Sequence, residues 1–187
     1  FIRVNNLWNP RLAPRAGEHV FNGGIYRDVS IIITEPVHIS WYGTFVSTPK
    51  VSEENADIAV TTEVENHSLE KVKLTLLSTV EYKGEVLCLM SARKTIDPGG
   101  KKEISQLGSV NNPRLWHPDC PELYTLKSRI YVNYLLSDEY DTVFGIRWFS
   151  FTSQKGFYLN GKPYPILGAN VHQDHAGWGD AVTHSGI

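Results

Sequence analysis

The sequence has few of the features that mark several common classes of protein. Two cysteines among 187 residues are too few for a disulfide framework or a four-thiolate zinc site. No apolar run approaches the roughly 20 residues that span a bilayer, and the start FIRVNN is no charged-then-apolar leader. The formal net charge is −2, and the lysines and arginines form no basic face. We therefore expect no signal peptide, no membrane span and no nucleic-acid partner.

The two cysteines lie in different surroundings. Cys88 is part of the apolar run VLCLM and is expected to be a small buried hydrophobic residue. Cys120 lies in the polar segment HPDCPEL. The sequence gives no positive reason for a bridge between them and does not exclude one. The redox compartment, cytoplasmic or periplasmic, stays open.

The sequence does contain the alternating apolar and polar residues that are typical of β-strands. In ADIAVTTEVEN, Ile58, Val60 and Val64 alternate with polar or small residues, which is typical of a half-buried strand. The runs 25–34 and 37–48 predict two earlier strands, separated at Glu35–Pro36. Lys83–Gly84 predicts a hairpin turn, and Asp97-Pro-Gly-Gly predicts another turn.

The clearest predicted strand is YTLKSRIYVNYL. Its apolar face carries Tyr124, Leu126, Ile130, Val132 and Tyr134, which we expect in the core. Short strands separated by turns fill residues 51–148, which suits a two-sheet antiparallel sandwich of immunoglobulin type with seven to nine strands. We expect essentially no helix of more than two turns.

The composition changes after residue 148. Asn160–Gly161 lies between two apolar runs and is the strongest short-range hairpin signal in the chain. The following run, ILGAN, has the length and composition of a buried strand. The tail GANVHQDHAGWGDAV, residues 168–182, then gathers two histidines, two aspartates and a tryptophan, as the lining of a binding site does.

Four segments follow one another in order at a suitable spacing. They are FNGGIYRDV (21–29), LWHPDCPELYTL (115–126), FGIRWF (144–149) and GFYLNGKPYPILGANVHQDHAGWGDAV (156–182). Together they resemble glycoside hydrolase family 2, and the last segment resembles its β-galactosidases most. The first residue is Phe1 and not methionine, so we expect a chain cut from something larger.

The resemblance implies an all-β chain with an immunoglobulin-like antiparallel β-sandwich and partial segments of neighbouring domains. Residues 1–36 would be the C-terminal end of a jelly-roll sugar-binding domain. Residues 37–148 would be the complete sandwich. Residues 149–187 would be the start of a (β/α)₈ catalytic barrel, with ILGAN as its first strand.

The resemblance also suggests which residues contact substrate in an intact enzyme. His172 would follow the first barrel strand and donate a hydrogen bond to a sugar hydroxyl, because barrel strands end at the active site. Trp178 could stack on a sugar ring or pack between domains. Glu18 aligns with an acidic residue near the substrate and a monovalent cation. Asp174 lies beside His172, but the His-x-Asp-His spacing is no recognised metal-ligand set.

The sequence departs from the family pattern at the catalytic step. It contains no Asn–Glu dipeptide, the pair that carries the general acid/base in the family, and the nucleophilic glutamate lies further still. Retaining hydrolysis needs two carboxyl groups about 5–5.5 Å apart. We therefore expect no catalytic residue, metal or cofactor in this chain. The parent enzyme would use Mg²⁺ and a monovalent cation.

The substrate implied for the parent is a β-galactoside or oligosaccharide, and a homo-oligomer is compatible with the pattern. Val171 stands where related enzymes carry a basic residue, which leaves β-glucuronidase and β-mannosidase as rivals. A second function, a carbohydrate-binding or adhesive sandwich module, predicts a row of exposed aromatic residues on one sheet face.

Overall fold

The computed structural model describes residues 1–5, 7, 9, 11, 24–170 and 175–183. The chain divides into two compact units. One unit comprises Ile33–Ile166, and the other combines Phe1–Ile32 with Leu167–Ile187. All the named strands belong to the first unit, and the described residues include no helix.

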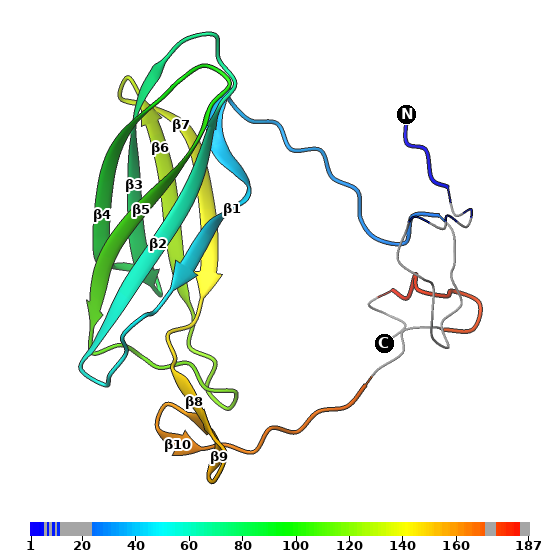
Figure 1. The fold of residues 1–187 in the computed structure, drawn as a ribbon, viewed down its shortest axis with the longest axis vertical. Coiled ribbons are helices and arrows are strands. Elements are labelled where there is room, and N and C mark those ends of the chain that lie inside the picture. The colour runs from blue at the N-terminus through cyan, green and yellow to red at the C-terminus, as the bar shows by residue number, and fades with distance from the viewer. Residues whose placement is uncertain (6, 8, 10, 12–23, 171–174, 184–187) are drawn as a thin grey trace. The chain divides into compact units, whose positions relative to one another are not determined.

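Seven long strands build a sandwich of two antiparallel sheets (Figure 1). One sheet has the order β1-β2-β5 and the other the order β4-β3-β6-β7. The strands are β1 Val37–Ser47, β2 Asn55–Asn66, β3 Val72–Tyr82, β4 Glu85–Ile96, β5 Lys101–Asn111, β6 Tyr124–Val132 and β7 Leu135–Phe144. The number of strands, their antiparallel pairing and the two-sheet arrangement confirm the predicted immunoglobulin-like fold.

The alternating apolar side chains of β2 are buried in the core. Every second side chain from Ala56 to Asn66 is buried, while those between them are partly exposed. Ile58 and Val60 pack in one apolar cluster with Tyr124 and Leu126, and Val64 packs in a second cluster with Leu76. Both clusters therefore take side chains from both sheets, which is how a sandwich buries one face of each sheet.

Polar side chains are also buried among the strands. The hydroxyl of Ser78 donates to Oε1 of Gln106 on the opposite sheet at 2.7 Å. The amide of Gln106 donates to the carbonyl of Leu76 at 3.3 Å. Because a buried polar group costs little only when it is hydrogen-bonded, these contacts link the two sheets in a defined register.

Both predicted two-residue hairpins are present. Lys83 and Gly84, with φ of 49° and 87°, join β3 to β4. Asn160 and Gly161, with φ of 49° and 78°, join β9, Gly156–Leu159, to β10, Lys162–Pro163. Two consecutive positive φ values are the requirement of a type I′ turn, which glycine and asparagine meet at low cost. The predicted turn at residues 97–100 joins β4 to β5.

The prediction that Tyr134 lies in the core is wrong. Strand β6 ends at Val132, and Asn133 and Tyr134 form the turn to β7 with φ of 50° and 67°. The side chain of Tyr134 is 99% exposed. The period of two ends where the backbone turns, so a residue in phase with the strand no longer shares its face. Tyr124, at the start of β6, is buried as predicted.

Two predicted strands are not formed. Residues 25–34 have no strand, and Ile31 is 88% exposed. Residues 166–170, the ILGAN run, also have no strand. Both runs have the apolar composition of strands, but a strand exists only where a neighbour accepts its backbone hydrogen bonds. No described strand pairs with either run.

The cysteines do not pair. Cys88 and Cys120 are both free thiols. Cys88 is only partly buried, against the first apolar cluster, whereas the run VLCLM predicted a buried residue. Cys120 is exposed and closes a short turn with His117.

Candidate functional site

The tail that suggested a binding site forms a tight backbone turn where it is described. The amide of Gly179 donates to the carbonyl of His175 at 2.8 Å, and the amide of His175 donates back at 3.1 Å. Gly177 and Gly179 have φ of 89° and 55°, which a residue with a Cβ adopts at a cost. The glycines of the run HAGWG therefore make this turn.

The turn presents two rings stacked on each other. The imidazole of His175 and the indole of Trp178 lie 4.9 Å apart between centroids, with an angle of 24° between their planes. Nδ1 of His175 lies 2.9 Å from the carbonyl of Ala176. Trp178 is 48% exposed. The predicted stacking residue is thus accessible, and one of its faces is shared with His175.

The first and last motif segments meet in this unit. Nη1 of Arg27 donates to the carbonyl of Asp180 at 2.7 Å, across 153 residues of sequence. The guanidinium of Arg27 also lies 4.9 Å from the ring centroid of Tyr26. A guanidinium bound to a backbone carbonyl holds the turn at a fixed place beside the segment 24–28.

Three of the four predicted substrate-contacting residues, His172, Asp174 and Glu18, lie outside the described residues. Their assignment remains a prediction. Trp178 is the member whose surroundings the structure gives, and those surroundings are a stacked, half-exposed ring.

The two middle motif segments meet at the end of the sandwich. The amide of Trp116 donates to the carbonyl of Ile146 at 2.8 Å. The guanidinium of Arg147 lies 4.5 Å from the ring centroid of Trp116. A Cβ on Gly145 would lie 2.9 Å from Trp116, so glycine is needed there. Packing explains why LWHPD and FGIRW have these residue types.

The predicted Asn–Gly hairpin is attached to the same junction. The side chain of Asn160 donates to the carbonyl of Trp116 at 3.0 Å, and the amide of Trp148 donates to Oδ1 of Asn160 at 3.1 Å. The amide of Asn160 in turn donates to the carbonyl of Trp148 at 2.9 Å. These bonds fix a small sheet of β8, Phe149–Thr152, with β9 and β10, at the end of the sandwich (Figure 1).

Several carboxylates of the sandwich are in ion pairs on the strand faces or in the turns between strands. The pairs are Glu81 with Lys127, Asp97 with Lys71, Glu139 with Arg129, and Glu63 and Glu65 with Lys101. Glu122 accepts a hydrogen bond of 2.6 Å from the hydroxyl of Tyr82, which lowers the pKa of that carboxyl. A lowered pKa favours the charged form, opposite to the raised pKa of a general acid.

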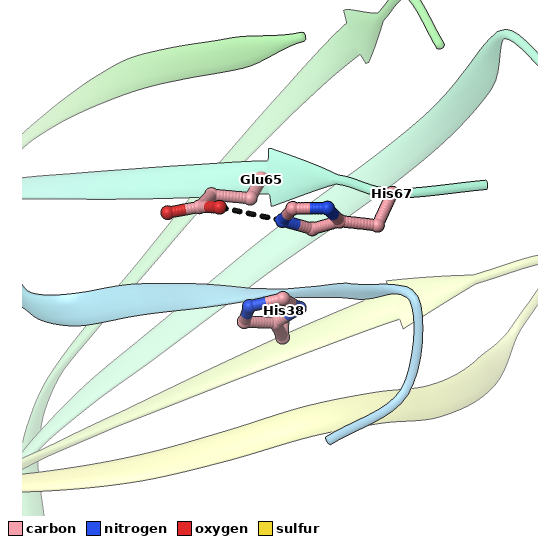
Figure 2. Close-up of side chains that lie close together, drawn as sticks. All are labelled: His38, Glu65 and His67. Atoms are coloured by element: carbon pink, nitrogen blue, oxygen red, sulfur yellow. Dashed lines mark hydrogen bonds and ion pairs between the residues drawn. The ribbon is translucent and has the colours of Figure 1, made fainter. Parts of the chain in front are cut away.

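One group of side chains among the described residues could hold a metal ion. His38, Glu65 and His67 each offer one ligand atom, and these atoms lie within 4.8 Å of one another (Figure 2). The rings of His38 and His67 are 5.3 Å apart between centroids, at 12°. Sequence reasoning missed this group because His38 and Glu65 are far apart in the chain. The Glu65-x-His67 spacing at a strand end was the available signal.

The asparagine of the Asn66-His-Ser sequence is structural. Its side chain is fully buried, and its amide donates to the carbonyl of Glu70 at 2.8 Å and to that of Ile96 at 3.2 Å. Its Oδ1 accepts a hydrogen bond of 3.0 Å from the amide of Ser68. A side chain with these bonds ties the end of β2 to the turn after β4. Asn66-His-Ser has the form of an N-glycosylation acceptor, but the buried side chain of Asn66 is not accessible for glycosylation.

The described part of the chain contains no helix of the length and hydrophobicity that a bilayer span requires.

The chain resembles enzymes that hydrolyse glycosides. It is 33% identical to β-galactosidase BoGH2A of Bacteroides ovatus over 187 residues, which is all of this chain and 21% of the relative. It is 31% identical to a β-glucuronidase of Formosa agariphila over 89% of this chain and 17% of the relative. The chain thus spans about a fifth of the length of these relatives.

Solved structures give the same result. The crystal structure of a Bacteroides uniformis β-glucuronidase matches 97% of this chain with a TM-score of 0.89 and 34% identity, and the match covers 23% of that enzyme. The model of the family described as glycosyl hydrolases family 2 matches residues 37–147, which hold the seven long strands. With the sandwich and the ordered motif segments, this match places the chain in glycoside hydrolase family 2.

Proposed function

We propose that this chain is a non-catalytic part of a longer retaining exo-β-glycosidase that hydrolyses terminal β-galactosides in carbohydrate metabolism. The observation that carries the proposal is the match of the whole chain to a β-galactosidase of about five times its length. The tail HQDHAGWG favours a galactosidase. Relatives named β-glucuronidases match nearly as well, so β-glucuronides are the alternative substrate, with β-mannosides further off.

In this proposal the sandwich is a support for the catalytic domain. The junction of Trp116, Arg147 and Asn160 joins the sandwich to β8–β10, the segment from which a barrel would continue. A rigid junction matters because a substrate-positioning group displaced by about 1 Å can lower the rate 100-fold. The division into residues 1–36, 37–148 and 149–187, and the use of Mg²⁺ and a monovalent cation, belong to the same proposal.

The first test is activity of the chain alone. We expect the purified chain to release no nitrophenol from nitrophenyl β-galactoside or β-glucuronide above background, because it lacks the two carboxyl groups that the reaction needs. The longer product of the gene should cleave one of them, with the galactoside preferred. Turnover by the chain alone that survives repeated purification contradicts the proposal.

The second test concerns His172 in the longer protein. We expect His172→Ala to lower turnover about 30- to 1000-fold, the size expected for a preorganised donor to the transition state, with the melting temperature unchanged. The matched variant is His117→Ala, whose imidazole packs edge-on to Tyr164 at 5.3 Å between centroids and should not affect turnover. A melting temperature that collapses along with activity makes His172 a packing residue.

A second candidate function rests on a depression over β3, β4 and β6. Its volume is about 740 Å³, and its lining includes Tyr131 and Tyr134 with Lys73, Arg93 and Lys94. Aromatic rings beside cationic groups suit an acidic sugar. Binding of a uronic-acid oligosaccharide to the purified chain, lost in the double variant Arg93→Ala/Tyr131→Ala, would favour the binding-module function.

A further inference from the structure

We propose that His38, Glu65 and His67 bind a zinc ion at the start of β1 and the end of β2. The site is separate from the proposed glycosidase chemistry and does not depend on it. Two imidazoles and one carboxylate are a ligand set that Zn²⁺ accepts, with the fourth position left for water.

The register of the sandwich brings the three side chains together. β1 and β2 are antiparallel, and His38 lies directly opposite Glu65. His67 follows two residues after Glu65, and its amide donates to the carbonyl of Pro36 at 2.8 Å. Directly paired residues and residues two apart share one face of a sheet. The three side chains therefore project from one face of a single strand pair (Figure 2).

The ligand atoms need only small shifts to reach the spacing that a zinc ion requires. The three atoms lie within 4.8 Å of one another, while zinc with bonds of about 2.0–2.2 Å needs them roughly 3.3–3.6 Å apart. The imidazole planes are nearly parallel, so one ring must turn for both nitrogen lone pairs to point at the ion. That turn is about χ2 of histidine, a soft torsion with a broad minimum.

The second nitrogen of His38 already has a partner. Nδ1 lies 3.0 Å from the carbonyl of Glu35, so it donates its hydrogen there and leaves the Nε2 lone pair free. Metal-binding histidines commonly hold the ring in this way, with the other nitrogen donating to a carbonyl or carboxylate.

The two carboxylate oxygens of Glu65 have different partners. Oε1 of Glu65 lies 2.9 Å from Nζ of Lys101, and Oε2 lies 2.6 Å from Nε2 of His67. Each carboxylate oxygen of Glu65 therefore has one partner, Lys101 on one side and His67 on the other. When a metal replaces the hydrogen bond at Oε2, the hydrogen leaves Nε2 of His67 and the neutral ring carries its hydrogen on Nδ1, while Lys101 keeps Oε1 and orients the carboxylate.

The experiment is a zinc titration of the purified chain by calorimetry near neutral pH, with cobalt absorption as a second readout. We expect one saturable site per chain. His38→Ala and His67→Ala should each weaken binding at least about tenfold, since even the partners that only orient a ligand are worth 10- to 100-fold. The matched control is His117→Ala, a half-buried histidine outside the proposed site, which should keep the affinity of the parent chain.

Melting curves supply the second measurement. An ion that binds only the folded chain raises the melting temperature, and we expect this rise in the parent chain and in His117→Ala but not in His67→Ala. His67 is exposed, so His67→Ala should fold, and a metal-free melt checks that. Absence of a saturable site, or an affinity in the His38→Ala and His67→Ala variants equal to that of the parent chain, overturns the proposal. If either alanine variant fails to fold, Glu65→Gln replaces it.

Discussion

Residues 25–34 and residues 56–66 make an instructive comparison, because both runs are rich in β-branched residues. IYRDVSIIIT has no strand and leaves Ile31 88% exposed. ADIAVTTEVEN is β2, the central strand of its sheet, with Ile58 fully buried. β2 has β1 on one side and β5 on the other, whereas no described strand pairs with residues 25–34. A strand sequence therefore needs neighbours before its pattern becomes structure.

The largest effect should come from removing the same side chain in each run. We expect Ile58→Ala to lower the free energy of unfolding by about 2–5 kcal/mol, through lost burial and the cavity that remains. Ile31→Ala should change it by less than about 0.5 kcal/mol, as exposed positions do. Urea unfolding followed by tryptophan fluorescence measures both. A comparable loss in the two variants would mean that residues 25–34 are packed.

A buried and an exposed asparagine extend the comparison to polar side chains. Asn66→Ala removes the amide that bonds the carbonyls of Glu70 and Ile96, and we expect a loss of about 2–3 kcal/mol, because buried carbonyls are left unpaired. Asn5 accepts one exposed hydrogen bond from the amide of Leu7 at 2.9 Å, so Asn5→Ala should be near neutral. Thermal melts decide between these values, and an unchanged melt for Asn66→Ala would contradict the structural role.

The two tyrosines predicted to share a face offer a smaller contrast. The hydroxyl of Tyr124 accepts a hydrogen bond of 2.7 Å from the amide of Arg114, so Tyr124→Phe should cost about 1–2 kcal/mol. Tyr134→Phe should cost nothing measurable, because that ring is solvent-exposed. If the two variants lost the same free energy of unfolding in chemical denaturation, Tyr134 would have to be buried.

The smallest expected effect is the pH dependence due to Glu65, because solvent screens the interactions of a carboxylate near the surface. Hydrogen bonds from Lys101 and His67 lower its pKa to about 2 in the folded chain, below the usual value of 4.5. The unfolded chain therefore takes up the proton first as the pH falls, and the stabilisation is complete above about pH 4.5 and lost towards pH 2. In chelator, the melting temperature of the parent chain should fall more over this range than that of Glu65→Gln. If the melting temperatures of the two chains fell in parallel with pH, Glu65 would not be the cause of the pH dependence.

Local sequence determined the elements whose cause is local. The period of two in β2 follows from which residues avoid water, and the turns at Lys83–Gly84 and Asn160–Gly161 follow from the positive φ that these residues tolerate. The family resemblance depended on four segments in order, and it predicted the sandwich without any knowledge of strand pairing.

Tertiary structure decided what depends on residues distant in sequence. A period-two pattern says which side chains share a face, but not which strand lies alongside, so it could not show that residues 25–34 stay unpaired or that β3 pairs with β6. The pattern also could not predict that His38 lies opposite Glu65, or that Asn66 is buried beneath the turn after β4. Those placements are set by the register of antiparallel strands, a non-local choice made when the two sheets close on their common core.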